Sequence, residues 1–490
     1  MVKFKESLLE YTALIVLFGL FCWLHFDRLT ADLWNDELYS IKEFVLAPIG
    51  KTLTDYHSPN NHIFFNFINN LYLKVIGIHD LSTLIEHPVI LRIISAIYGF
   101  FTWVFLYKIG KSVQGKWLGF TAIIILATTL PYWTFVFQLR GYGLSMLLIT
   151  MLSYFALSYL NEPKYKHLPF VSVCTLLLFY TTVITLYSIC GILTGLGILF
   201  IFTLSKKKSS KPFLFLLFAI FVGLFAGLLL YSPVFSRVFA NEFVHAGIPF
   251  QFDHLFNIGR ALLHDVLSNR WALFVLIFAG IIFAKGFLRK NGKILLVMMC
   301  TAITPLLIVF VRGDATPMRT FSVLLPIISM LIAMSILPIQ KILNSRFQWI
   351  FPIILSTYCL FISSQENQNV KIKLLRDLSQ GIRSQNLYYQ YYSAHYQPLE
   401  DLKRFNERWN DNHTPLVLVG CEPFGAPYFL EQQNIQFLKE DSLSNYYKAN
   451  DRIFILTNFP NKLEVPTGWS MEVLNEPLTY HNFILLTRNR

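Results

Sequence analysis

The sequence is poor in charged residues and in cysteines that could pair. Charged side chains make up 14% of the 490 residues, whereas soluble globular proteins carry about 25%. Five of the six cysteines lie within apolar runs and only Cys421 lies in a polar region, which excludes a disulfide framework or a zinc-finger spacing. Hydrophobic residues make up 54% and the mean hydropathy is +0.49. The composition therefore indicates a membrane protein rather than a string of soluble domains.

Long apolar runs account for most of the first 364 residues. Runs of about 17 to 20 apolar residues can cross the hydrocarbon core as helices. We expect about eleven transmembrane helices, at residues 8–26, 89–107, 117–137, 141–160, 168–185, 187–204, 212–232, 271–287, 294–311, 320–338 and 348–364. Six tryptophans lie near the ends of these runs, as interfacial anchors do: Trp23, Trp103, Trp117, Trp133, Trp271 and Trp349.

The basic residues are distributed unevenly. The net charge of +12 would suggest nucleic-acid binding in a soluble protein. Here the lysines and arginines gather in alternate loops between the apolar runs, as in Lys206 to Lys208 and Lys211. By the positive-inside rule these loops are cytoplasmic. We therefore expect no nucleic-acid partner, a cytoplasmic N-terminus, an extracytoplasmic C-terminus and a multi-pass location in a bacterial inner (cytoplasmic) membrane.

Three polar segments are expected on the outer side: residues 27–88, 233–270 and 365–490. The first contains two amphipathic stretches, Glu37 to Leu46 and Ile63 to Ile76, that could lie in the interface as helices. The last has short β-rich runs separated by helical or turn-like sequence, which favours a small α/β domain; the runs are Leu416–Val419, Arg452–Leu456 and Phe483–Thr487. The predicted organisation is a transmembrane catalytic domain at 1–364 and an extracytoplasmic α/β domain at 365–490.

Asp36 and Glu37 are adjacent carboxylates just beyond the first apolar run. Neighbouring side chains point in different directions, which argues against a pair sharing one proton. One of them could act as a general base on an acceptor hydroxyl or amine while the other structures the loop. The alternative is that both are solvated loop acids.

A second polar cluster follows at residues 55–62. His57 and His62 could bind a metal, polarise a phosphate or orient a sugar, and Asn60 and Asn61 could hydrogen-bond hydroxyls. Two histidines five residues apart on a loop do not form a recognised zinc spacing. A turn at Ser58 with a helix cap at one of the asparagines is the alternative.

Two arginines are expected at the outer ends of apolar runs. Arg140 precedes Tyr142 at the start of one run and Arg319 begins another. An arginine at this depth must snorkel, pair or hold an anion, and its planar fork suits a phosphate. Arg260 and His264 in the 233–270 loop are weaker candidates, since with Asp265 they could equally form a salt-bridged helix face.

Together these motifs resemble those of the bacterial C-type (GT-C) membrane glycosyltransferases of family 39, which are similar to protein O-mannosyltransferases and related to the lipid A aminoarabinose transferase. The resemblance covers most of residues 1–340 and rests on Trp34–Glu37, Ser58–His62, Leu139–Tyr142, and Arg319 before Leu324-Leu325-Pro326. Many relatives have His-Pro-Pro-Leu in place of residues 57–62, so that either His57 or His62 could take the histidine role.

The resemblance implies an inverting transferase that moves a sugar from a polyprenyl-phosphate donor to a protein, lipid or glycan acceptor at the outer membrane face. It implies Asp36 as the base, with Glu37 beside it. The donor would be bound by Arg140, Tyr142, Arg319, His57, Asn61 and His62. A lipid monophosphate donor requires no cofactor, although some relatives bind a divalent metal, and no metal ligand set is evident here.

Two alternatives remain from the sequence. A transporter or flippase for lipid-linked sugars would also have many spans and intramembrane arginines, but no repeat symmetry is evident. An O-antigen polymerase or ligase would also have many spans and outer loops, but would lack an Asp-Glu pair directly after the first helix.

Overall fold

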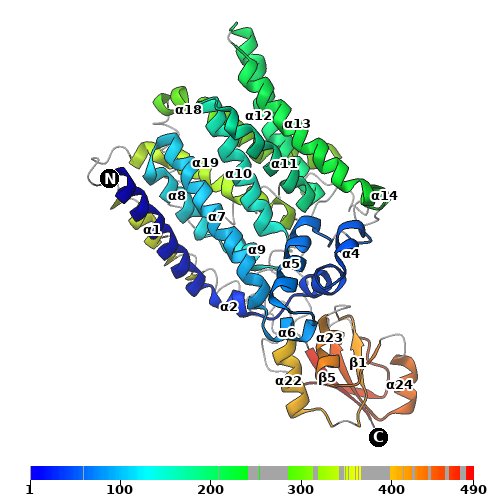
Figure 1. Ribbon diagram of the computed structural model, residues 1–490. Helices are drawn as coiled ribbons and strands as arrows, with labels where there is room; N and C mark the ends of the chain where they lie inside the picture. Colours follow the sequence, from blue (N-terminus) through cyan, green and yellow to red (C-terminus); the bar gives the residue numbers. More distant parts are fainter. Residues whose placement is uncertain are drawn as a thin grey trace.

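The protein is a helical bundle with an α/β unit at one end (Figure 1). The computed structural model describes residues 2–240 except 59 and 208, residues 253, 256, 285–312 and 318–340, and most of 347–365 and 398–489. The helices of the bundle and of the outer loop are α1 (Val2–Leu24), α2 (Phe26–Thr30), α3 (Asn35–Ser40), α4 (Ile49–Thr54), α5 (Ile63–Ile76), α6 (Leu81–Glu86), α7 (Val89–Gln114), α8 (Lys116–Ala127), α9 (Leu130–Phe137), α10 (Tyr142–Asn161), α11 (Leu168–Thr181), α12 (Leu186–Ser205), α13 (Lys211–Tyr231), α14 (Phe235–Ala240), α18 (Lys285–Arg312) and α19 (Leu325–Gln340).

The chain is an integral membrane protein, and six helical segments of the described part are long and apolar enough to span a membrane. They are 89–114, 142–161, 183–205, 211–238, 291–312 and 319–336, and they confirm six of the expected runs. The run at 8–26 corresponds to α1, whose apolar part is Leu8–Leu24, and the run at 168–185 contains the 14-residue helix α11. The run at 271–287 lies almost wholly outside the described residues, and that at 348–364 lies partly outside them.

The single helix expected at 117–137 is wrong, because α8 and α9 meet there at a bend of 77°. Pro131 stands in the first turn of α9 and cannot donate to the preceding turn. Pro131 leaves Ala127 O without a backbone donor, and Trp133 Nε1 donates to this carbonyl at 2.6 Å. The neighbouring carbonyls of Ile124 and Leu126 accept the backbone N–H groups of Thr128 and Thr129, and the hydroxyls of the same two threonines donate to them as well. A broken helix in a membrane is tolerated when its backbone groups are satisfied in this way.

Two of the expected interfacial tryptophans lie in the interior instead. Trp103 and Trp133 are fully buried and pack with Phe18 and Phe21 of α1, with ring centroids 5.0 to 5.9 Å apart. Their position near a span end predicted membrane anchoring, but the bend moves Trp133 into the bundle. Aromatic packing therefore joins α1 to α7 and α9.

The outer loop forms a helical shelf. The stretch Glu37 to Leu46 becomes α3 and a π-helical turn at Ile41–Val45, and Ile63 to Ile76 becomes α5, so both expected helices are confirmed. The polar face of α5 points inward, where three asparagines are buried: Asn66, Asn69 and Asn70. Asn70 Nδ2 donates to Ala47 O at 2.7 Å, which fastens α5 to the end of the π-helical segment.

The C-terminal unit is a mixed five-stranded sheet with three helices. Its strands lie in the order β2-β1-β3-β5-β4, with the first three parallel and the last two pairs antiparallel. The elements are α22 (Pro398–Arg408), β1 (Leu416–Val419), α23 (Gly425–Gln432), β2 (Leu438–Lys439), α24 (Leu443–Ala449), β3 (Arg452–Thr457), β4 (Trp469–Val473) and β5 (Asn482–Arg488). The three expected strands correspond to β1, β3 and β5, so the small α/β unit is confirmed.

Candidate active site

The two adjacent carboxylates have different surroundings. Glu37 is 1% exposed, and its Oε2 accepts from the Trp34 backbone N–H at 2.7 Å. The same oxygen pairs with Arg92 Nη2 at 2.9 Å, and Oε1 accepts from the Leu139 N–H at 2.7 Å. Glu37 therefore ties three separate segments together, and both of its oxygens are occupied by protein donors.

Arg92 was not indicated by any motif, yet it organises the loop that carries the acids. Its side chain is almost fully buried in the first turn of α7. Besides Glu37, its two terminal nitrogens donate to the backbone carbonyls of Arg28, Leu29, Ala31 and Asp32. The sequence does contain one signal that could have identified Arg92: it is a lone arginine at the outer end of an apolar run, and a charge at that depth requires partners.

Asp36 faces two cations instead of backbone donors. Its Oδ2 lies 3.0 Å from Arg140 Nη1 and 4.0 Å from Arg319 Nη2. The Arg140 side chain is 4% exposed, whereas those of Asp36 and Arg319 are 21% and 24% exposed. Asp36 therefore lies between a buried cation and a partly exposed one.

Arg140 has unused hydrogen-bonding capacity. Its Nε is buried and makes no hydrogen bond to any described residue, whereas Nη1 is paired with Asp36 Oδ2 at 3.0 Å. A buried guanidinium donor without an acceptor is costly in a folded protein. The planar guanidinium, beside the partly exposed Asp36 and Arg319, suits a ligand with acceptor oxygens, such as a phosphate.

His62 completes the cluster in its neutral form. Burial, followed by the charges of Arg140 and Arg319, lowers the pKa of His62 well below its usual value. Its Nδ1 accepts from the Gly141 N–H at 2.7 Å, so the ring proton resides on Nε2, which is 3.4 Å from Arg140 Nη2. The Tyr142 ring meets the His62 ring edge to face at 5.3 Å and lies 5.8 Å from the Arg140 guanidinium. Glycine is required at position 141, because a Cβ there would lie 2.7 Å from His62 Nδ1.

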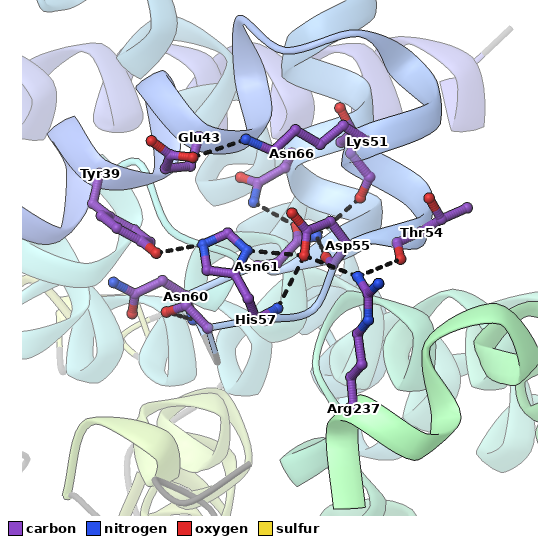
Figure 2. Close-up of polar contacts among 12 residues, drawn as sticks. Tyr39, Glu43, Lys51, Thr54, Asp55, His57, Asn60, Asn61, Asn66 and Arg237 are labelled. Carbon is purple, nitrogen blue, oxygen red and sulfur yellow. Dashed lines mark hydrogen bonds and ion pairs between the residues drawn. The ribbon is translucent and has the colours of Figure 1, made fainter. Parts of the chain in front are cut away.

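His57 belongs to a different cluster, with Tyr39, Asp55 and Arg237 (Figure 2), and its side chain is exposed. Its Nδ1 donates to Asp55 Oδ1 at 2.8 Å and its Nε2 accepts from the Tyr39 hydroxyl at 2.7 Å. Asp55 also pairs with Arg237 of α14 at 3.2 Å, which joins the loop to the end of the α13 span. The structure thus brings His62, and not His57, against Arg140.

Asn61 and Asn60 make their hydrogen bonds within the outer loop. Asn61 is buried, and its amide is used within the loop: Nδ2 donates to Thr52 O and Asp55 O, and Oδ1 accepts from Asn66. Asn60 is partly exposed, and its carbonyl accepts a long hydrogen bond from Ser40 Oγ. Arg260 and His264 lie outside the described residues. Among the residues that the structure describes, no three His, Cys, Asp or Glu side chains are grouped as metal ligands.

No protein-family model and no curated protein sequence matches this chain. The fold is similar to that of ArnT from Cupriavidus metallidurans bound to undecaprenyl phosphate, with 12% identity, a TM-score of 0.56 and coverage of 97% of each chain. The apo state of the same protein gives 11% identity, a TM-score of 0.53 and coverage of 97% of this chain and 98% of that one. Similarity over the full length at this identity establishes the fold, so the GT-C membrane fold expected from the motifs is confirmed.

Proposed function

We propose that the protein is an inverting glycosyltransferase that takes its sugar from a polyprenyl-phosphate donor. The observation that carries this proposal is the Asp36 carboxylate held beside two arginines, one of which is buried with an Nε that bonds no described residue. Displacement at a sugar phosphate requires a group that binds the leaving phosphate and a base that deprotonates the acceptor, and here the two lie in contact. The shared fold with ArnT, whose crystal structure contains undecaprenyl phosphate, supports the same substrate class.

In the proposed mechanism Arg140 and Arg319 bind the donor phosphate. Preorganised cations stabilise the charge that develops on a leaving phosphate. His62 would supply a neutral Nε2–H donor next to Arg140. The Gly141 N–H holds the His62 ring in this tautomer by donating to Nδ1. Tyr142 would support the guanidinium from the side. We do not assign donor contacts to His57 or Asn61, since their polar groups are bonded within the outer loop.

Asp36 acts as the general base. The acceptor O–H or N–H attacks the anomeric carbon opposite the phosphate, the bond between that carbon and the phosphate oxygen breaks, and polyprenyl phosphate leaves with the electron pair. Asp36 takes the acceptor proton, and the single displacement inverts the anomeric centre. Glu37 holds the loop and is assigned no proton-transfer role, because its oxygens already accept three bonds. The leaving group is a monophosphate faced by two arginines, so we assign no metal to the reaction.

The remaining features fit this activity. We place the N-terminus in the cytoplasm and the outer loop and C-terminal α/β domain (365–490) outside, in a bacterial inner membrane, with the polyprenyl chain between the spans of the catalytic domain (1–364). The acceptor is a protein, lipid or glycan reached from the outer face, and no nucleic acid is involved.

The test is transfer by the purified protein. Radiolabelled polyprenyl-phosphate sugars are supplied with envelope extracts as acceptors, and the product and its anomeric configuration are identified. Asp36→Asn keeps size and removes the base, so we expect turnover to fall about 100-fold or more. Asp80→Asn is the matched control, because Asp80 is an exposed cap on α6. Transfer unchanged by Asp36→Asn would overturn the base assignment, and movement of intact donor across vesicles without transfer would favour a flippase.

A further inference from the structure

The C-terminal α/β unit contacts the segment that carries Asp36. Figure 1 shows this unit at the end of the bundle where α2 and α6 lie. Two side chains of the loop bond directly to it. Asp32 Oδ2 accepts from the Leu399 N–H of α22 at 2.9 Å, and Asn35 Oδ1 accepts from the Gly425 N–H of α23 at 3.1 Å.

Both contacts are helix caps supplied from a distant part of the chain. The first amides of a helix have no partner within it, and side-chain oxygens of aspartate and asparagine are among their preferred acceptors. Pro398 begins α22 without an N–H, so Leu399 carries the first amide of that helix, and Gly425 is the first residue of α23. A carboxylate at a helix N-terminus also interacts favourably with the helix dipole. The caps of α22 and α23 therefore come from the loop that holds the base.

The hydrophobic core continues across the same junction. Leu33, between the two capping residues, is fully buried and belongs to one apolar cluster with Leu402, Phe429 and the rest of the α22–α23 layer. The opposite face of the sheet has its own cluster around Ile453 and Ile484. Lys42 adds a contact at the edge, with Nζ 5.1 Å from the Tyr428 ring centroid. The α/β unit is thus packed onto the loop as well as bonded to it.

The loop is fixed on its other side by the bundle. Arg92 donates to Asp32 O at 3.1 Å and to Glu37 Oε2 at 2.9 Å. Asp36 lies one residue after Asn35 and one before Glu37, so the base is held between a contact to the α/β unit and a contact to the bundle. Both contacts restrict movement of the Asp36 backbone away from Arg140.

We propose that Asp32 and Asn35 are positioning residues through which the C-terminal α/β domain fixes Asp36 against the phosphate-binding arginines. The domain is then part of the catalytic apparatus, acting through the loop and not through contact with substrate. This inference rests on the proposed function for its kinetic consequence, whereas its structural consequence can be measured without any substrate. Both are measured on the same full-length variants.

The variants are Asp32→Ala and Asn35→Ala, which remove the caps, and Asp32→Asn and Asn35→Asp, which keep an acceptor oxygen. Misplacing a reacting group by a fraction of an ångström to an ångström costs one to two orders of magnitude, so we expect kcat of each alanine variant to fall about tenfold with donor KM nearly unchanged. The acceptor-keeping variants should recover most of kcat. Asp411→Ala is the control, since it removes a carboxylate that accepts from the His413 and Thr414 amides within the α/β unit.

Hydrogen exchange provides the second readout. The Leu38 amide bonds Trp34 O in the first turn of α3, and the Leu139 amide bonds Glu37 Oε1. We expect faster exchange in peptides spanning 34–40 and 137–141 in the alanine variants but not in Asp411→Ala. Alanine variants that keep wild-type kcat, or that speed exchange in α22 and α23 alone, would overturn the proposal. If the wild-type protein transfers no sugar, the proposed function fails and the exchange at 34–40 still decides whether the domain holds the loop.

Discussion

At the residue scale, the main result is that two adjacent acids have different partners. Sequence alone predicted that one acid of the pair could act while the other structures the loop, but it could not say which. Burial decides the matter: Glu37 accepts from two backbone amides and Arg92, whereas Asp36 faces Arg140 and Arg319. The partner that separates them, Arg92, is 55 residues from Glu37 and has no motif around it.

Glu37→Gln should destabilise the protein strongly. The substitution keeps the size of the side chain but leaves the Arg92 guanidinium buried without its counter-charge, which costs about 3 kcal/mol or more. Thermal unfolding of the detergent-solubilised protein measures this. Glu43→Gln is the matched control, because the Glu43–Lys51 pair lies at the surface and should contribute less than about 1 kcal/mol. Equal losses in the two variants would contradict the structural role of Glu37.

At the element scale, the apolar runs predicted where the helices lie, but they did not predict the bend between α8 and α9. The run at 117–137 has the length of one span and contains no charged residue, so hydropathy treats it as continuous. The sequence Thr128-Thr129-Leu130-Pro131 breaks it, because Pro131 cannot donate to Ala127 O and the Trp133 indole N–H satisfies that carbonyl instead. This bend carries residues 138–141 to the outer loop, where Leu139 meets Glu37 and Gly141 meets His62.

Trp133→Phe should lower the thermal stability of the protein more than Trp103→Phe does. Both indoles are fully buried in the same aromatic cluster, but only Trp133 donates to a carbonyl at the break, whereas Trp103 Nε1 makes no hydrogen bond within the described residues. Leaving Ala127 O buried without that donor costs about 1 to 3 kcal/mol beyond the lost packing. The difference in thermal stability between the two variants measures this term, and a difference near zero would show that the hydrogen bond does not hold the bend.

At the scale of the whole molecule, the loop after α1 is the junction at which the membrane bundle and the α/β unit meet. Its residues Asp32 to Glu37 bond to α22, α23, α7 and the segment after α9. The sequence predicted both parts of the molecule, since apolar runs and alternating β-rich runs are local patterns. It did not predict their contact, because the capping pairs are separated by more than 360 residues.

The stability of this junction should depend on pH because Asp32 titrates there. Burial raises the pKa of Asp32 to about 6, against the opposing effects of the Leu399 N–H and Arg92; Asp401 raises it further and Lys403 lowers it. A carboxyl whose pKa is raised in the folded state contributes stability below its unfolded pKa near 4 and loses that contribution as pH rises to about 6.

Asp32→Asn should therefore be nearly neutral below pH 4 and stabilising above pH 6, by at most about 3 kcal/mol. Asparagine keeps an oxygen for the Leu399 amide and removes the charge that is buried at neutral pH. Thermal unfolding as a function of pH, for this variant and for Asp411→Asn as control, measures the effect. A constant difference between wild type and Asp32→Asn from pH 4 to pH 8 would contradict the raised pKa.

Sequence alone predicted the membrane class, six spans that the described residues confirm, three of the five strands of the α/β unit, and a set of candidate site residues that includes Asp36, Arg140, Arg319 and His62. These follow from local composition and from motifs whose chemistry is evident in a few consecutive residues. The folded structure was needed to show which acid faces the arginines, which histidine lies beside Arg140, and which contacts hold the loop in place. Those outcomes depend on burial and on contacts between distant segments, and the free energy of a charge is set by the partners that the folded chain brings to it.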